Sequence, residues 1–107
     1  MAQFDDRVKG EEARFAMNAE QAFKAEARRN KLLGIWAAEL MSLSGDAARA
    51  YAAEVVASDF AKPGDEDVFL KVTGDLKAKG LSVPDAMVRQ KMAQLVAVAK
   101  DQILNEG

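Results

Sequence analysis

Helix-forming residues dominate this chain, and only two prolines, Pro63 and Pro84, interrupt it. The stretches between its turn signals are rich in Ala, Leu, Lys, Glu and Arg, which favour helices, rather than in the β-branched residues that favour strands. The 107 residues are enough for one packed core and leave no room for a second one beside it. The sequence therefore predicts an all-α fold.

The last predicted helix has the clearest start signal. Ser82 is a suitable N-cap, Pro84 is tolerated in a first turn, and Asp85 stands at the capping-box position. Apolar residues then recur at steps of three and four, which predicts a helix with one buried face that continues to about Leu104. They are Met87, Val88, Met92, Leu95, Val96, Ala99 and Ile103.

Two further helices are expected upstream of this one. The acidic run 65–67 places negative charge at the positive end of a helix dipole, and Gly80 is placed to end that helix as its C′ residue. The run lacks the alternating spacing and the glycine of a calcium loop, so a metal cluster is the weaker reading. Another helix opens at Gly45 and closes at the turn signal 62–64. The two apolar faces are Val68, Phe69, Val72 and Leu76, and Ala48, Tyr51, Ala52, Val55, Val56 and Phe60.

The first 43 residues contain no proline and read as helix over most of their length, but their two parts differ. Residues 32–43 have a high apolar density and are assigned to the helical bundle. Their core-spaced residues are Leu33, Trp36, Leu40 and Met41. A lone Trp in such a stretch is typically part of a core, although Trp36 is also close enough along the helix to pair with an arginine or a ligand.

The N-terminal segment carries too few apolar residues for a core of its own. Its large apolar residues fall near one helical face, which is the pattern of a helix that binds in a groove. They are Phe4, Val8, Phe15 and Phe23. Gly10 costs about 1 kcal/mol of helix stability relative to Ala, so the isolated segment should fray in water. We expect an arm over residues 1–19, mobile when free and helical when docked, followed by a bundle domain over 20–107. The alternative is an arm that folds back on its own bundle.

The residue types that the chain lacks exclude several classes of function. With no His and no Cys, the chain lacks the commonest general base, the commonest metal ligand and a cysteine nucleophile. No glycine-rich phosphate motif is present, so we expect neither an enzyme nor a required cofactor. A net charge of -2 is not that of a nucleic-acid binder. No apolar run is long enough to cross a bilayer, and early charges argue against a secretory signal, so a cytoplasmic location is predicted.

A basic cluster formed by Lys24, Arg28, Arg29 and Lys31 is the candidate ligand site. Lys24 and Arg28 lie one helical turn apart and Lys31 follows three residues later, so three cations can point toward one phosphate or acidic partner. The alternative is a solvated helix face on which Glu20 pairs with Lys24 at i,i+4 spacing. Spacing alone leaves both readings open.

Several blocks of the sequence resemble the zeta subunit family of alphaproteobacterial F-type ATP synthases, an inhibitor of the ATPase activity of the catalytic head. They are Phe4-Asp5-Asp6-Arg7, the run from Phe23 to Gly34 followed by Trp36-Ala37-Ala38-Glu39, Gly64-Asp65-Glu66-Asp67-Val68, and the stretches 51–60 and 89–98. The long central block is the specific one. Together the blocks extend over nearly the whole chain.

This resemblance implies a four-helix bundle whose N-terminal arm inserts at a catalytic α/β interface and blocks rotation in the hydrolysis direction. The inhibitory residues it implies are Phe4, Asp5, Asp6, Arg7, Glu12 and Phe15. The partners would be the α and β subunits of the catalytic head, with the central rotor subunit as a further candidate, so the protein would be peripheral to the inner membrane. It also implies weak binding of ADP or ATP as a regulatory ligand, which we assign to the basic cluster. Gly10 and residues 17–20 depart from the family pattern.

Two other classes of protein stay open on the sequence. The first is a nucleotide-sensing helical module that regulates another target, for which the basic cluster would matter more than the arm. The second is a helical scaffold that has no effect on ATP hydrolysis. An ATP hydrolysis assay that compares deletion of residues 1–14 with charge reversal in the basic cluster separates these classes.

Overall fold

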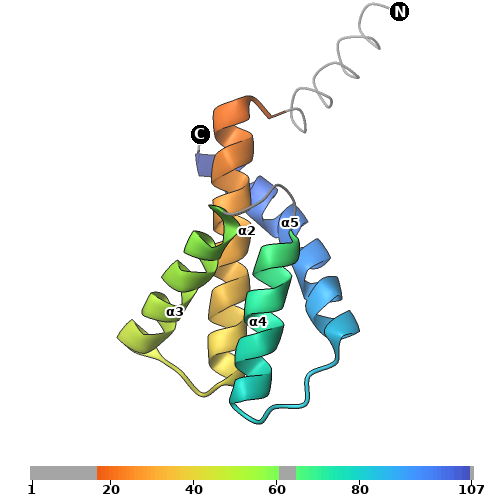
Figure 1. The fold of residues 1–107 in the computed structure, drawn as a ribbon. Coiled ribbons are helices and arrows are strands. Elements are labelled where there is room, and N and C mark those ends of the chain that lie inside the picture. The colour runs from red at the N-terminus through yellow and green to blue at the C-terminus, as the bar shows by residue number, and fades with distance from the viewer. Residues whose placement is uncertain (1–16, 61–64, 107) are drawn as a thin grey trace, which may run out of the picture.

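The computed structural model describes residues 17–60 and 65–106. This part of the chain forms four α-helices and one short 3-10 helix (Figure 1). They are α2 (Ala19–Leu40), α3 (Gly45–Ala57), η1 (Ser58–Phe60), α4 (Glu66–Ala78) and α5 (Asp85–Glu106). The predicted all-α fold and four-helix bundle are therefore confirmed. The arm predicted over residues 1–19 falls almost entirely outside the described residues, so its extent stays a prediction.

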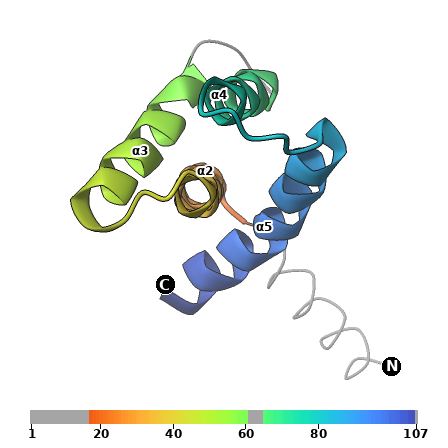
Figure 2. The same cartoon turned by 90° about the horizontal axis from the view of Figure 1, so that it is seen from below.

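Helix α2 is the central element of the bundle. Seen along its axis, α3, α4 and α5 are arranged around it (Figure 2). Helix α2 packs mainly on α3 and α5, while α4 lies between those two and contacts both. The C-terminal end of α5 returns to the first turns of α2 (Figure 1). Each face of α2 therefore meets a different neighbour.

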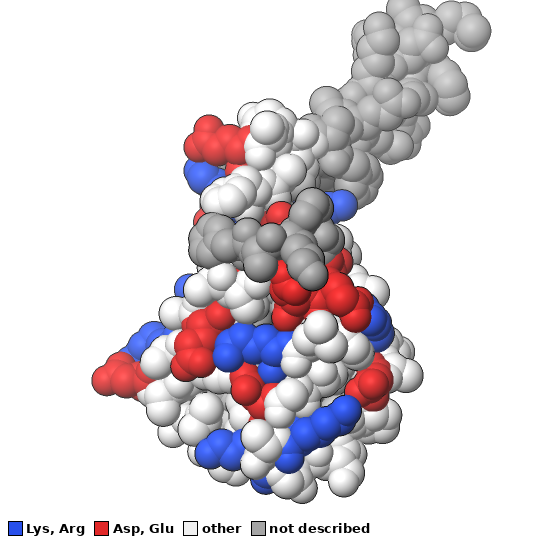
Figure 3. Space-filling view, viewed as in Figure 1, with Lys and Arg blue, Asp and Glu red and all other residues white. Residues whose placement is uncertain are grey.

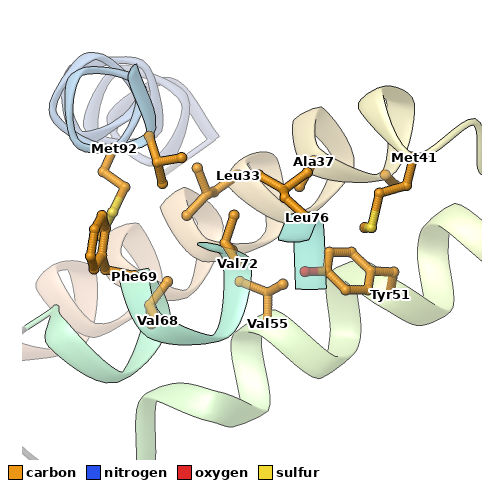
Figure 4. Close-up of a cluster of buried hydrophobic side chains, with 12 residues drawn as sticks. Leu33, Ala37, Met41, Tyr51, Val55, Val68, Phe69, Val72, Leu76 and Met92 are labelled. Atoms are coloured by element: carbon orange, nitrogen blue, oxygen red, sulfur yellow. The ribbon is translucent and has the colours of Figure 1, made fainter. Parts of the chain in front are cut away.

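The core is a cluster of buried side chains from all four helices (Figure 4). Its members are Leu33, Ala37, Ala38, Met41, Tyr51, Val55, Val68, Phe69, Val72, Leu76, Val88 and Met92. The cluster confirms the apolar face predicted for α4 and, for α3, Tyr51 and Val55, while Ala48 and Trp36 pack against it. Two predicted core residues are wrong, because Leu40 is 39% exposed and Met87 is 49% exposed. Both lie in terminal turns, where neighbouring helices do not cover them.

The buried face of α2 begins earlier than the sequence indicated. Ala25, Arg29 and Asn30 are buried although they precede the apolar stretch assigned to the bundle. An Asn18 capping box starts the helix: the Gln21 N–H donates to Asn18 Oδ1 at 2.7 Å, and the Asn18 N–H donates to Gln21 Oε1 at 3.2 Å. The burial of these residues was missed because they are small or polar.

The C-terminal end of α4 and the start of α5 can be compared with the two capping residues predicted from the sequence. Gly80 has a φ of +78°, and the Leu81 N–H donates to the Leu76 carbonyl at 3.0 Å, so Gly80 is confirmed as the C′ residue of a Schellman motif. The Ser82 N-cap is wrong, because α5 begins at Asp85 and the Pro84 carbonyl accepts its first hydrogen bonds. The residue before a proline avoids the helical conformation, which moves the start of α5 past Val83.

Ser42 ends α2 in the left-handed conformation, with a φ of +63°. Glycine adopts this conformation without the steric cost that a Cβ brings. We expect Ser42→Gly to raise the free energy of unfolding by about 0.5–1 kcal/mol in urea denaturation followed by circular dichroism. Ser44→Gly is the control, since Ser44 has a φ of -146° and its side chain makes no capping bond. An equal gain in both variants would contradict the assignment.

Candidate functional site

The six predicted inhibitory residues cannot be placed in the fold. Phe4, Asp5, Asp6, Arg7, Glu12 and Phe15 all lie outside the described residues. The basic cluster, in contrast, lies entirely within α2. Its surroundings, and those of the helix start that leads to the predicted arm, form the site described below.

Three residues of the basic cluster are accessible on α2. The Lys24 ammonium lies 3.2 Å from Glu20, the i,i+4 pair expected of a solvated face. Arg28 donates to Gln102 Oε1 at 2.7 Å and lies 2.6 Å from Glu106, which connects α2 to the C-terminal end of α5. The hydrogen bond to Glu106 raises the pKa of Arg28 and lowers the pKa of Glu106. Lys31 is exposed.

Arg29 points into the protein instead. Only 3% of its surface is exposed, and its guanidinium donates to Asp65 Oδ1 at 2.7 Å and to Asn30 Oδ1 at 2.6 Å. Asn30 in turn donates to Asp59 Oδ2 at 3.0 Å. These four side chains form a partly buried polar network that connects α2 with η1 and with the start of α4. The structure thus separates Arg29 from the other three members of the cluster.

Sequence reasoning missed this network, although one signal pointed to it. Ala25, Arg29 and Leu33 follow one another at i,i+4 steps, so Arg29 stands on the buried face of its helix. A buried arginine needs a carboxylate partner. Asp65, assigned from the sequence to the dipole of α4, is that partner, and it remains the residue that precedes the first turn of α4.

A pocket of about 410 Å³ opens beside the network. Its described lining is Met17, Ala22, Ala25, Glu26, Arg29, Asp65, Val96 and Lys100. Met17 is the first described residue, so the pocket adjoins the point where the predicted arm joins the bundle. The lining offers cations, carboxylates and apolar walls, with no nucleophile and base in contact. Such a lining suits binding rather than catalysis.

The pKa values of two carboxyl groups at this site are shifted in opposite directions. The hydrogen bond from Arg29 holds the pKa of Asp65 below its ordinary value. Partial desolvation raises the pKa of the largely exposed Glu26, and the neighbouring Asp59 carboxyl raises it further. The ionised form of Asp65 therefore stabilises the fold, whereas ionisation of Glu26 destabilises it.

Glu26→Gln should stabilise the protein at neutral pH. Because the pKa of Glu26 is raised on folding, its contribution to stability is complete below the ordinary value of 4.5 and is lost as the pH rises through the folded-state value. The variant should melt above the wild type at pH 7, and the difference should disappear near pH 4. Melting curves at both pH values measure this effect, and a difference that does not change with pH would contradict it.

The acidic residues at the start of α4 are used within the fold. Glu66 and Asp67 occupy its first turn, and Glu66 accepts a hydrogen bond from Arg89 of α5 at 2.9 Å. Figure 3 shows acidic side chains gathered at this end of α4, with both signs of charge interspersed over the rest of the visible face. In residues 17–60 and 65–106, no group of three or more acidic side chains could hold a metal ion. No helix in the same ranges is long and apolar enough to cross a membrane.

Fold and site together describe a small helical binding protein, and comparison with known proteins identifies its family. The family model for ATPase inhibitor subunit zeta matches residues 1–102. A protein with a structure determined by NMR in solution is 58% identical, with a TM-score of 0.71, over 79% of this chain and 96% of that chain. No match was found among curated proteins.

The chain belongs to the ATPase inhibitor subunit zeta family, which confirms the resemblance found in its sequence. It is an inhibitor subunit and not an enzyme. Membership of the family implies inhibition of ATP hydrolysis by an F-type ATP synthase, and therefore an interaction with that enzyme.

Proposed function

We propose that this protein inhibits ATP hydrolysis by inserting its N-terminal arm between an α and a β subunit of the catalytic head. The inserted arm blocks rotation in the hydrolysis direction and spares ATP synthesis. The observation that carries the proposal is the folded bundle, whose described core residues come from α2, α3, α4 and α5. The inhibitory assignment uses residues that precede this bundle in the chain.

The composition of the arm suits a cleft between subunits. Phe4 and Phe15 would be the apolar anchors, while Asp5, Asp6, Arg7 and Glu12 would pair with charges on the cleft walls. An arm that orders on binding loses conformational entropy at that step, so its affinity responds to anything that changes the free arm. The bundle, held outside the cleft, adds bulk in the path of the central rotor subunit.

ADP or ATP is proposed as a weak regulatory ligand of the basic cluster. Lys24, Arg28 and Lys31 offer the accessible cations, each of which can donate to phosphate oxygens. Arg29 would join them only if a phosphate replaced Asp65 as its partner. A nucleotide-sensing module with another target remains the second candidate function, supported by these three cations.

Deletion of residues 1–14 should abolish inhibition of ATP hydrolysis by purified catalytic heads. The deletion removes five of the six assigned inhibitory residues, all except Phe15, which predicts an increase in the inhibitory concentration of about 100-fold or more. A full-length variant with Phe4→Ala and Phe15→Ala should lose most of the inhibition at unchanged chain length. Both variants should keep the melting temperature of the bundle, which circular dichroism measures.

The control reverses the charge of an accessible cation, Arg28→Glu. If the arm carries inhibition, this variant inhibits hydrolysis like the wild type, whereas its affinity for ADP, measured by calorimetry, falls. Undiminished inhibition by the deletion variant would refute insertion of the arm. No inhibition by the intact protein at any concentration would favour the scaffold alternative.

A further inference from the structure

Helix α5 has an apolar surface on the side that faces away from the core. Val88, Met92 and Ala99 are buried on its inner face. Ala93, Ala97 and Leu104 lie on its opposite side, with Val96 at the margin between the two. A surface helix with one neighbouring face normally carries polar residues on the other. This second apolar face therefore requires an explanation that the core does not supply.

The outer face of α5 lines a groove of about 540 Å³. Its described lining is Ala93, Val96, Ala97, Lys100, Asp101, Leu104 and Asn105. Val96 and Lys100 also line the pocket beside Arg29, so the two hollows adjoin at these residues. Met17 lines that pocket, which means that the chain enters the described bundle beside the middle of the groove.

We infer that this α5 groove binds the chain's own N-terminal arm, residues 1–16, in the free protein. The point of attachment supports this occupant, because Phe15 is only two residues from Met17. Length supports it as well: a helix of 16 residues extends about 24 Å, and the lining from Ala93 to Asn105 extends about 18 Å along α5. The arm is therefore long enough to reach from Met17 to either end of the groove.

The side chains of arm and groove are complementary in size. Phe4, Val8 and Phe15 fall on one face of a helix, and they are large. The groove is lined by the small residues Ala93 and Ala97, which leave space for large side chains between them. Lys100 and Asp101 provide one charge of each sign beside this apolar strip, and the arm flanks its own strip with charges of both signs.

Docking in the α5 groove has a regulatory consequence that rests on the proposed function. The same apolar face of the arm serves the groove and the cleft of the catalytic head, so the two binding events exclude each other. The apparent affinity for the enzyme is then lowered by the fraction of arm that is undocked. Because the apolar strip is thin, docking is weak and the arm exchanges between the docked and free states.

Paramagnetic relaxation tests the docking directly. The chain has no Cys, so a nitroxide can be attached at a single introduced cysteine. We choose Gln94→Cys, exposed on α5 beside the groove, and Lys77→Cys, exposed on α4, as the control position. The label on Gln94→Cys should broaden the amide signals of residues 4–15, and the label on Lys77→Cys should not. Adding Ala97→Glu should remove the broadening.

Two outcomes would overturn the inference. Equal or absent broadening from the two labels would show that the arm does not occupy the groove. Broadening between labelled and unlabelled molecules in a mixed sample would show that a second copy occupies it instead. Both results are independent of inhibition, so they decide the docking even if the proposed function fails.

The hydrolysis assay then tests the regulatory consequence. Ala97→Glu should inhibit at a concentration about threefold to tenfold lower than the wild type, because it frees the arm. Ala53→Glu places the same change on an exposed position of α3 and should leave inhibition unchanged. If Ala97→Glu removes the broadening but does not increase potency, the competition between groove and cleft is refuted.

Discussion

Gly34→Ala should destabilise the protein by about 2 kcal/mol, although the same substitution usually stabilises a helix. A Cβ at position 34 of α2 would lie 2.7 Å from the Ala52 Cα and 3.2 Å from Val55 Cγ2. The first of these atoms belongs to the backbone of α3 and cannot rotate away. The overpacking cost therefore exceeds the gain in helix propensity, and urea denaturation measures the difference.

Gly74 offers the matched control for this prediction. It lies in α4, and a Cβ there would meet no heavy atom within 4 Å. Gly74→Ala should therefore stabilise the protein by about 0.5–1 kcal/mol through helix propensity alone. If the same Gly→Ala substitution lowers stability in α2 and raises it in α4, the close approach of α2 to α3 is the cause. A loss of stability in both variants, or in neither, would contradict this account.

Asp65→Ala should cost about 2–3 kcal/mol of unfolding free energy, because it leaves the buried Arg29 guanidinium without its carboxylate. The reciprocal change Arg29→Met should cost about 1 kcal/mol, since the Asp65 side chain is 49% exposed and returns to water. Glu66→Ala breaks a pair exposed on both sides and should change stability by less than about 0.5 kcal/mol. Chemical denaturation at pH 7 measures all three.

The ion pair of Arg29 with Asp65 should make the free energy of unfolding depend on pH. The pKa of Asp65 is lowered by Arg29, so its contribution is present above the ordinary value of 3.8 and is lost as the pH falls through the folded-state value. The stability difference between wild type and Asp65→Asn should therefore close at acid pH. Equal costs for the Asp65 and Arg29 variants, with a difference that persists in acid, would argue against an ion pair between the buried Arg29 and Asp65.

Local patterns predicted much of the fold because helices are decided by nearby residues. The apolar face of α4, most of that of α3 and the left-handed Gly80 depend on interactions within a few residues, and the structure contains them. Leu40 and Met87 were predicted to be buried and are exposed, because periodicity cannot show where neighbouring helices stop.

The candidate site was less accessible to such reasoning. The basic cluster reads as one feature along the sequence, yet Arg29 is buried while Lys24, Arg28 and Lys31 remain accessible. Its partner Asp65 lies 36 residues away, across the full length of α3. No short-range pattern connects two such residues, because their meeting depends on the packing of α2 against the start of α4.

The sequence by itself determined the helical class, most of the buried faces and the family, since composition, periodicity and motif blocks are properties of the chain. The tertiary structure decided which side of α2 receives each neighbour, why Gly34 has no side chain, and that α5 carries an apolar face on its outside. Those features arise from contacts between segments distant in sequence, and packing geometry selects them only once the four helices have come together.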